Sequence, residues 1–519
     1  MSVSRRVVAG ACAVVCAALA EGCTSNVATQ SPPPDAVLYE GARVIIGDAS
    51  AAIDNAAFLV ENHRFSRVGR AGEVTAPAGA RRVDLSGKTV MPAFVDMHSH
   101  VGFENATTAS ELKENFTREN VVDHLERFAY SGHALTLSLG SDLPERWVWQ
   151  LRDDSSADSF VGARLQTVGR GLAWPGTGPF ELARNDTAYP IVSTWQARNA
   201  VRELAAQKVP FVKLWLEDRG GYEVAADRRD RGKLVEEHGV PLKGRPSQLT
   251  PEIYRAAIDE AKKHGLRTLA HVKTREDLKD LLRAGIDGWT HPIADLPADD
   301  ELIELLRERS HLWYIPAITP SGSGGSAPRA AGERPSWMAD PLLNAIKCPA
   351  YLDQWGRAFE TSKRVPPPNG GVGVENVKRF YDAGVRIALG SHDAGGNRPI
   401  GWGTHLEIEA FVNWIGMTPQ AAIISATSAA AEALGVQQDL GTVAAGKSAD
   451  FIVLEANPLE DIRNTRRIAG VVLRGQELDR DRLRAKWQGA CAAAGSRQTP
   501  ALPPPVAGGA APGTSPSNQ

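Results

Sequence analysis

The middle of this 519-residue chain alternates short apolar runs with amphipathic stretches at helical spacing, and this alternation restricts the fold most strongly. Eight runs are candidate strands: VMPAFVDM, HALTLSLG, ARLQTVG, VPFVKLWL, LRTLAHV, IDGWTH, LWYIPAI and VRIALGS. Several are separated by helical stretches such as PEIYRAAIDEAKKHG, which starts with a proline and ends at Gly265. The pattern predicts an α/β fold with a (β/α)8 TIM barrel over residues 91–431. A doubly wound sheet is disfavoured because no glycine-rich phosphate fingerprint follows the first run.

The two ends of the chain share a different pattern. Residues 34–90 alternate apolar and polar positions, with Gly, Asn and Asp at the breaks, as expected for short strands. A similar pattern returns in residues 432–485, for example in GTVAAGKSADFIVL. We therefore expect both ends to form one small β-sandwich domain into which the barrel is inserted.

The N-terminus has the features of a targeting segment. Arg5 and Arg6 precede an apolar run at positions 7–20, which is shorter than the roughly 20 residues that a membrane-spanning helix needs. Residues 1–22 are therefore predicted to be a signal peptide, and the protein is expected in the bacterial periplasm, at the cell envelope or outside the cell. A lipid anchor on Cys23 remains an alternative to simple cleavage because Gly22-Cys23 resembles the end of a lipoprotein box.

Charge and cysteine content restrict the partners and the covalent framework. A formal net charge of -3 gives no broad basic surface for nucleic acid, so a small-molecule substrate is expected. Beyond the predicted signal and its edge, Cys348 and Cys491 are the two cysteines of the body. They either form one disulfide or remain two free thiols. The oligomeric state is not predicted.

Two segments do not fit the alternation of strands and helices. Residues 320–373 are rich in Gly and Pro, and we expect them to form a mobile cover over the barrel mouth, with Trp337, Tyr351 and Trp355 closing over substrate. A surface insertion without a role in the site is the alternative. Residues 492–519 form a Pro/Ala/Gly-rich tail that is predicted to be disordered.

Candidate metal ligands follow the predicted strands. His98 and His100 end the first run, and because side chains alternate along a strand, both should point to the same side while Ser99 points away. Lys213 lies in the fourth run, His271 and His291 end the fifth and sixth, and Asp393 follows the eighth. The carboxyl ends of barrel strands meet at one mouth, so these side chains should converge there.

These motifs resemble the amidohydrolase superfamily over nearly the whole chain that follows the predicted signal. The resemblance rests on GKTVMPAFVDMHSH, on the histidines of the fifth and sixth strands, on the Asp after the eighth, and on GTVAAGKSADFIVL. The segment MTPQAAIISATSAAAEALG is also similar to the imidazolonepropionase and Xaa-Pro dipeptidase branches. The resemblance implies a metal-dependent hydrolase that cleaves a carbon–nitrogen bond in an amide, a cyclic amide or a dipeptide-like compound.

The resemblance also implies a ligand set. Two divalent ions, usually zinc, are expected: His98, His100 and Asp393 bind one, His271 and His291 bind the other, and a carboxylated Lys213 bridges them. Unmodified lysine is a cation and does not bind metal, so the amine must first be neutral. The alternative is one zinc on His98, His100, His271 and Asp393. In that case Lys213 is unmodified and pairs with Glu217 or Asp218, and His291 faces the substrate.

In the expected mechanism, metal-activated hydroxide attacks the carbonyl carbon, and Asp393 acts as general acid and base. Candidate substrate contacts are Arg170 and Trp174 after the third strand, Tyr222 after the fourth, and His392 beside Asp393. Each has an alternative role in packing or in surface pairing. Lactone or phosphotriester hydrolysis at the same site is an alternative function, and a non-catalytic exported binding protein is another.

Overall fold

The structure is a computed structural model that describes residues 36–108, 110–175, 177–178, 186–216, 248–319, 332–361, 371–394 and 399–495. The predicted signal peptide, Cys23, Tyr222 and residues 496–519 of the predicted tail lie outside these ranges. Within these ranges, no helix combines the length and the apolar character needed to cross a membrane.

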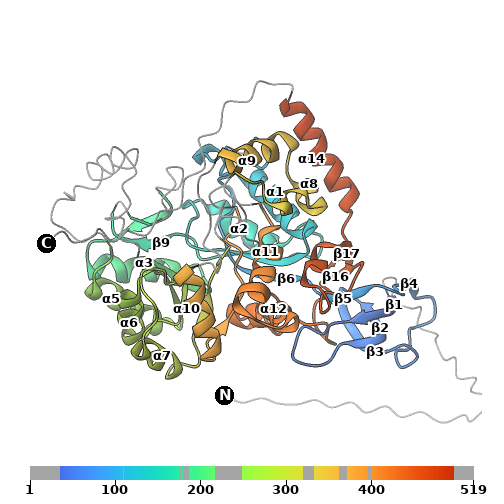
Figure 1. Cartoon of the computed structure of the whole chain (residues 1–519), viewed down its shortest axis with the longest axis horizontal. Helices are drawn as coiled ribbons and strands as arrows, with labels where there is room; N and C mark the ends of the chain where they lie inside the picture. The colour runs from blue at the N-terminus through green and yellow to red at the C-terminus, as the bar shows by residue number, and fades with distance from the viewer. Residues whose placement is uncertain are drawn as a thin grey trace, which may run out of the picture.

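Strands from both ends of the chain join in one mixed sheet (Figure 1). Its members are β1 (Val37–Val44), β2 (Ile53–Glu61), β3 (Arg64–Arg70), β4 (Arg81–Asp84), β5 (Thr89–Pro92), β16 (Phe451–Leu454), β17 (Ile468–Leu473) and β18 (Gln476–Glu477). The two ends meet where β5 pairs antiparallel with β16, with Met91 opposite Ile452. The core of this domain contains stacked and edge-on aromatic rings, such as Phe58 and Phe451 at 5.1 Å between centroids. The expected β-rich domain from both chain ends is confirmed.

The barrel is built from parallel strands in two hydrogen-bonded groups. They are β6 (Phe94–Ser99), β7 (His133–Ser138) and β8 (Arg164–Thr167), and then β9 (Gly171–Ala173), β10 (Ala188–Pro190), β11 (Phe211–Trp215), β12 (Arg267–His271), β13 (Gly288–Thr290), β14 (Trp313–Ile315) and β15 (Arg386–Ile387). The last strand region returns to the first, because the Met97 amide donates to the Leu389 carbonyl at 3.0 Å. The predicted TIM barrel is confirmed.

Helices surround the barrel (Figure 1). They are α1 (Arg118–Tyr130), α2 (Arg146–Asp154), α3 (Thr194–Ala206), α5 (Pro251–Lys263), α6 (Arg275–Ala284), α7 (Asp300–Arg307), α10 (Gly371–Asp382), α11 (Gly403–Ala410), α12 (Pro419–Ser425) and α13 (Ser428–Leu434). A π-helical turn, η5 (Phe411–Ile415), extends α11, and η1 (Lys113–Asn115) and η6 (Ile462–Arg466) are short 3-10 turns. In α5, Pro251 occupies the first turn and buried residues such as Ala257 and Ala261 face the barrel core, as the sequence pattern predicts.

The first predicted strand is divided in the structure. The run VMPAFVDM was expected to be one strand, but Pro92 ends β5 in the terminal sheet and Phe94 begins β6 in the barrel. The hydrogen-bond partners change here: the Ala93 amide donates to Asp450, whereas the Phe94 amide donates to Gly132. One apolar run therefore crosses from one domain into the other, which periodicity alone does not reveal.

Part of the Gly/Pro-rich insertion is helical. Residues 332–361 contain η4 (Ser336–Ala339), α8 (Pro341–Ile346) and α9 (Pro349–Thr361), whereas the SGSGGS segment lies outside the described residues. Trp337, Tyr351 and Trp355 are buried in a cluster with Trp402 and Trp487. The expectation that these rings offer apolar surface to a substrate is wrong, because they already bury that surface against each other and neighbouring helices.

A disulfide fixes this insertion to the C-terminal helix. Cys348 and Cys491 are bonded, with their Cα atoms 5.4 Å apart, and this decides between the two alternatives left open by the sequence. Cys491 lies in α14 (Arg480–Gly495), which packs on α1 and α8 (Figure 1). Residues 492–495 thus belong to a helix and not to the predicted tail.

Candidate metal and active site

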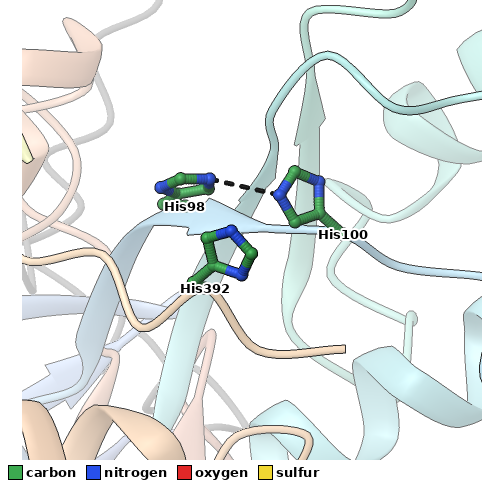
Figure 2. Close-up of side chains that lie close together, drawn as sticks. All are labelled: His98, His100 and His392. Atoms are coloured by element: carbon green, nitrogen blue, oxygen red, sulfur yellow. Dashed lines mark hydrogen bonds between the residues drawn. The ribbon is translucent and has the colours of Figure 1, made fainter. Parts of the chain in front are cut away.

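His98 and His100 lie at the carboxyl end of β6 and are both buried. Their Nε2 atoms are 3.2 Å apart (Figure 2). Ser99, between them, turns away and donates from its hydroxyl to the Leu137 carbonyl at 3.0 Å. The alternation of the strand thus brings two imidazoles to one point.

Asp96 connects the first barrel strand to the segment after the last one. Its carboxylate accepts hydrogen bonds from the His98 amide at 2.8 Å and from the Ser391 amide at 3.1 Å, and also from the hydroxyls of Ser391 and Thr404. Burial raises the pKa of Asp96 to about 6, although the hydrogen bonds act in the opposite direction. Asp96 was not predicted from the sequence, although it is a carboxylate on the same face of the strand as the two histidines.

Lys213 is fully buried in β11. Its Nζ donates to the Thr290 hydroxyl at 3.0 Å and lies 5.0 Å from the centre of the Trp215 ring. Gly140 makes room for this side chain, since a Cβ atom there would be 2.6 Å from the Lys213 Cγ. The alternative ion-pair partners, Glu217 and Asp218, lie outside the described residues.

His271 and His291 form a second pair of imidazoles at the ends of β12 and β13. Their ring centroids are 4.3 Å apart, and the ring of His291 is 5.0 Å from that of His98. Burial, reinforced by the neighbouring His271, lowers the pKa of His291 well below its usual value. His291 is therefore neutral, the form that binds metal, and its buried Nε2 has no hydrogen-bond partner among the described residues.

Asp393 is fully buried beyond the end of β15. Its Oδ2 accepts a hydrogen bond from the Gly403 amide at 3.1 Å, at the start of α11, and its backbone carbonyl accepts one from the His100 amide at 2.9 Å. The absence of a side chain at Gly403 is required, because a Cβ there would lie 1.9 Å from the Asp393 Oδ1.

His392 lies beside the first pair of histidines. One nitrogen each of His98, His100 and His392 all lie within 4.8 Å of one another (Figure 2). Among the described residues, these three form the group of His, Cys, Asp or Glu side chains whose ligand atoms lie this close together. His392 was predicted to be a substrate contact, and in the structure it lies next to two predicted metal ligands.

Two residues near the histidines were not predicted. The ring of Trp215 is 4.9 Å from that of His271 and 6.3 Å from that of His100, and alternation from Lys213 along the same strand would have found it. The hydroxyl of Ser141 is 2.6 Å from the Nδ1 of His100, which directs the other ring nitrogen toward His98. Nothing in the local sequence distinguishes Ser141 from an ordinary loop serine.

The donor set fits divalent metal ions. Buried imidazoles, a buried carboxylate and a buried lysine amine meet at the carboxyl ends of the barrel strands, and the neutral state of His291 leaves a lone pair on the ring. Imidazole and carboxylate ligands are those that zinc and similar ions take in catalytic sites. The residues present are therefore suited to the metals that the sequence motifs imply.

Comparison with known proteins identifies the family of the chain. The model of the amidohydrolase family matches residues 89–478, which include the barrel and the β-strands that return after it. The chain belongs to the amidohydrolase family.

Individual similar proteins come from different branches of the family. The chain is 29% identical over 223 residues to the ochratoxinase of Aspergillus niger, an alignment that covers 42% of this chain and 38% of that protein. It is 25% identical over 432 residues to the imidazolonepropionase of Cereibacter sphaeroides, covering 79% and 91% of the two chains. A crystal structure of a putative prolidase from Bifidobacterium longum superimposes with a TM-score of 0.62 at 22% identity, covering 88% of this chain and all of that one.

Two of the predicted substrate contacts of this amidohydrolase, Arg170 and Trp174, are packed against other parts of the protein. The Arg170 guanidinium donates to the Ala188 carbonyl at 2.6 Å and stacks 4.5 Å from the Tyr189 ring, and burial lowers its pKa. Trp174 is buried in the main core. Both side chains thus have packing roles, and Tyr222 lies outside the described residues.

Proposed function

We propose that this amidohydrolase cleaves a carbon–nitrogen bond in a small amide, cyclic amide or dipeptide-like substrate with the help of two divalent metal ions, most simply zinc. The observation that carries the proposal is a set of buried side chains that lie in or follow the barrel strands: His98, His100, Lys213, His271, His291 and Asp393. Family membership and the similarity to imidazolonepropionase support hydrolysis of this kind of bond.

By the family pattern, His98, His100 and Asp393 would hold one ion, His271 and His291 would hold the other, and a carboxylated Lys213 would contribute to both. Burial favours the neutral form of a lysine amine, and that form takes up carbon dioxide. In the alternative with one zinc, His98, His100, His271 and Asp393 hold the ion and His291 faces the substrate.

When bound, the metals would supply an activated water molecule and polarise the carbonyl group of the substrate. Asp393 accepts the proton of the attacking water and returns it to the leaving nitrogen. The Gly403 amide holds its Oδ2, so the carboxylate stays in one orientation while the proton moves.

We also propose that the protein is exported, with lipidation of Cys23 as an alternative to cleavage at an ordinary signal site. The Cys348–Cys491 disulfide supports this proposal because such bonds persist in oxidising compartments. Cell fractionation and mass spectrometry of the mature N-terminus test it, and a cytoplasmic protein with an intact N-terminus would contradict it.

Metal analysis and a Lys213→Ala variant test the hydrolase. We expect about two ions per wild-type chain, because the ligand set exceeds the roughly four donors of one tetrahedral zinc. Lys213→Ala should lose turnover on a panel of N-acyl amino acids, Xaa-Pro dipeptides, hydantoins and lactones, and acetate should partly restore it by replacing the bridge. Lys378→Ala, at an exposed lysine of α10, is the control. One ion per chain with full activity, or full activity of Lys213→Ala, would contradict the two-metal model.

A further inference from the structure

The segment that follows His100 turns sharply out of the barrel sheet. β6 ends at Ser99, and the next amide, that of His100, donates to the Asp393 carbonyl. Gly102 then has φ 105°, a conformation that favours glycine, and a Cβ atom there would lie 2.6 Å from the Phe116 ring. The course of the chain directly after a predicted metal ligand is therefore set by contacts outside the barrel strands.

Two side chains of α1 bind the backbone of this segment. The Gly102 amide donates to Nδ1 of His124 at 3.2 Å, and Nε2 of His124 donates to the Glu104 carbonyl at 2.7 Å. The side-chain amide of Asn120 donates to the carbonyls of Gly102 at 2.8 Å and of Glu104 at 2.9 Å. Asn120 and His124 are four residues apart, so they lie on one face of the helix. Together they supply the hydrogen bonds that a neighbouring strand supplies within a sheet.

The contacts of His124 define its protonation state. A backbone amide only donates and a backbone carbonyl only accepts, so Nδ1 of the ring carries the lone pair and Nε2 carries the proton. Burial lowers the pKa of His124 to about 3, so the ring is neutral near pH 7. Both nitrogens are engaged by the backbone, and no lone pair is left for a metal ion. His124 is thus a buried histidine with a supporting role and not a ligand.

We propose that Asn120 and His124 are positioning residues that hold His100 where it can bind an ion; this inference rests on the proposed metal-dependent function. Only Val101, itself buried, separates His100 from Gly102, so a shift of the Gly102 backbone moves the ligand. A ligand that its surroundings already orient binds metal more tightly than one that must be ordered when the ion arrives. Helix α1 thereby contributes to the metal affinity without touching the metal.

Metal titration of full-length variants tests this role. Each protein is stripped with a chelator and titrated with Zn²⁺ in competition with a coloured chelator. His124→Leu should lose roughly 10-fold or more in affinity for one ion, the lower end of the range for residues that orient a metal ligand. His124→Gln keeps an acceptor and a donor and should recover most of this loss. Leu125→Ala, which leaves a cavity under the same helix, is the control for destabilisation alone and should bind Zn²⁺ like wild type.

A double variant shows whether the effect passes through His100. His100→Asn removes the ligand itself, so adding His124→Leu should cause no further loss of affinity, whereas independent effects would add. Asn120→Ala, at a half-buried position of α1, should give a smaller loss that also disappears in the His100→Asn background. This variant decides the question if His124→Leu does not fold.

Three results would overturn the proposal. In the first, the folded His124→Leu or Asn120→Ala variant binds Zn²⁺ like wild type. In the second, Leu125→Ala loses as much affinity as His124→Leu, or His124→Gln recovers none of it. In the third, the losses add in the His100→Asn background. A wild type that binds no divalent ion would contradict the proposed function and this role with it, whereas equal binding by wild type and variants would overturn this role alone.

Discussion

The orientation of Asp393 depends on a residue that has no side chain. Gly403 donates its amide to the Asp393 carboxylate and leaves the space that this carboxylate fills. Gly403 is in the first position of α11, so alanine is compatible with its backbone but not with its neighbour. The steric effect of a single methyl group can therefore be measured separately from backbone strain.

Gly403→Ala should fold but lose most of its turnover. The new Cβ would lie 1.9 Å from the Asp393 Oδ1, so the carboxylate must move. A displacement of about 1 Å at a reacting group can lower the rate about 100-fold. Steady-state kinetics with metal analysis measure this loss. The control is Gly489→Ala in α14, where a Cβ meets no atom within 4 Å. Wild-type turnover in Gly403→Ala would remove Asp393 from proton transfer.

At this scale, alternation along strands predicted part of the site. It placed His98 and His100 on one side of β6 because an extended strand fixes the direction of each side chain. It gave no guide to His392, whose direction follows from a positive φ that the sequence does not encode locally. The bonds of Asp96 to Ser391 also join positions that only the closed barrel brings together.

Among the elements, the insertion after β14 is attached to the barrel through a buried ion pair. Lys347, which follows α8, pairs with Glu104 in the loop that leaves β6, and both side chains are buried. The backbone carbonyl of Glu104 also accepts hydrogen bonds from His124 and Asn120 of α1. The loop that follows His100 is thus held by α1 on one side and by the insertion on the other.

Lys347→Met should destabilise the fold by about 3–5 kcal/mol, because it leaves a buried carboxylate without its partner. The double variant Lys347→Met/Glu104→Gln should recover much of this loss, since no buried charge remains. Urea unfolding followed by circular dichroism measures both. Lys378→Met, which breaks an exposed pair with Asp382, is the control. Equal stability of Lys347→Met and wild type would show that the pair does not hold the insertion.

The elements differ in how well the sequence predicted them. Long apolar runs such as that of β11 identified the barrel strands, since a buried parallel strand is apolar on both faces. The helices α8 and α9 were missed because Gly/Pro-rich segments flank them. The division at Ala93 was missed because the sequence of a strand does not show which other segments it forms hydrogen bonds with.

For the whole molecule, the Cys348–Cys491 disulfide closes a loop of 143 residues. Cys348→Ser should lower stability by about 3–5 kcal/mol, the range for loops of this size. Unfolding by guanidinium chloride in oxidising and in reducing buffer measures it. The reductant should destabilise wild type and leave the variant unchanged. A wild-type protein that is insensitive to the reductant would contradict a stabilising role.

The pairing of β5 with β16 sets an order for biosynthesis. β5 leaves the ribosome early, but the strand that completes its sheet is made only after the entire barrel. At roughly 5–20 residues per second, this delay lasts tens of seconds. During that time the edge of β5 that later pairs with β16 is open to other chains. A ribosome that stops before Phe451 therefore releases a chain whose barrel is complete but whose first domain has no closing strand.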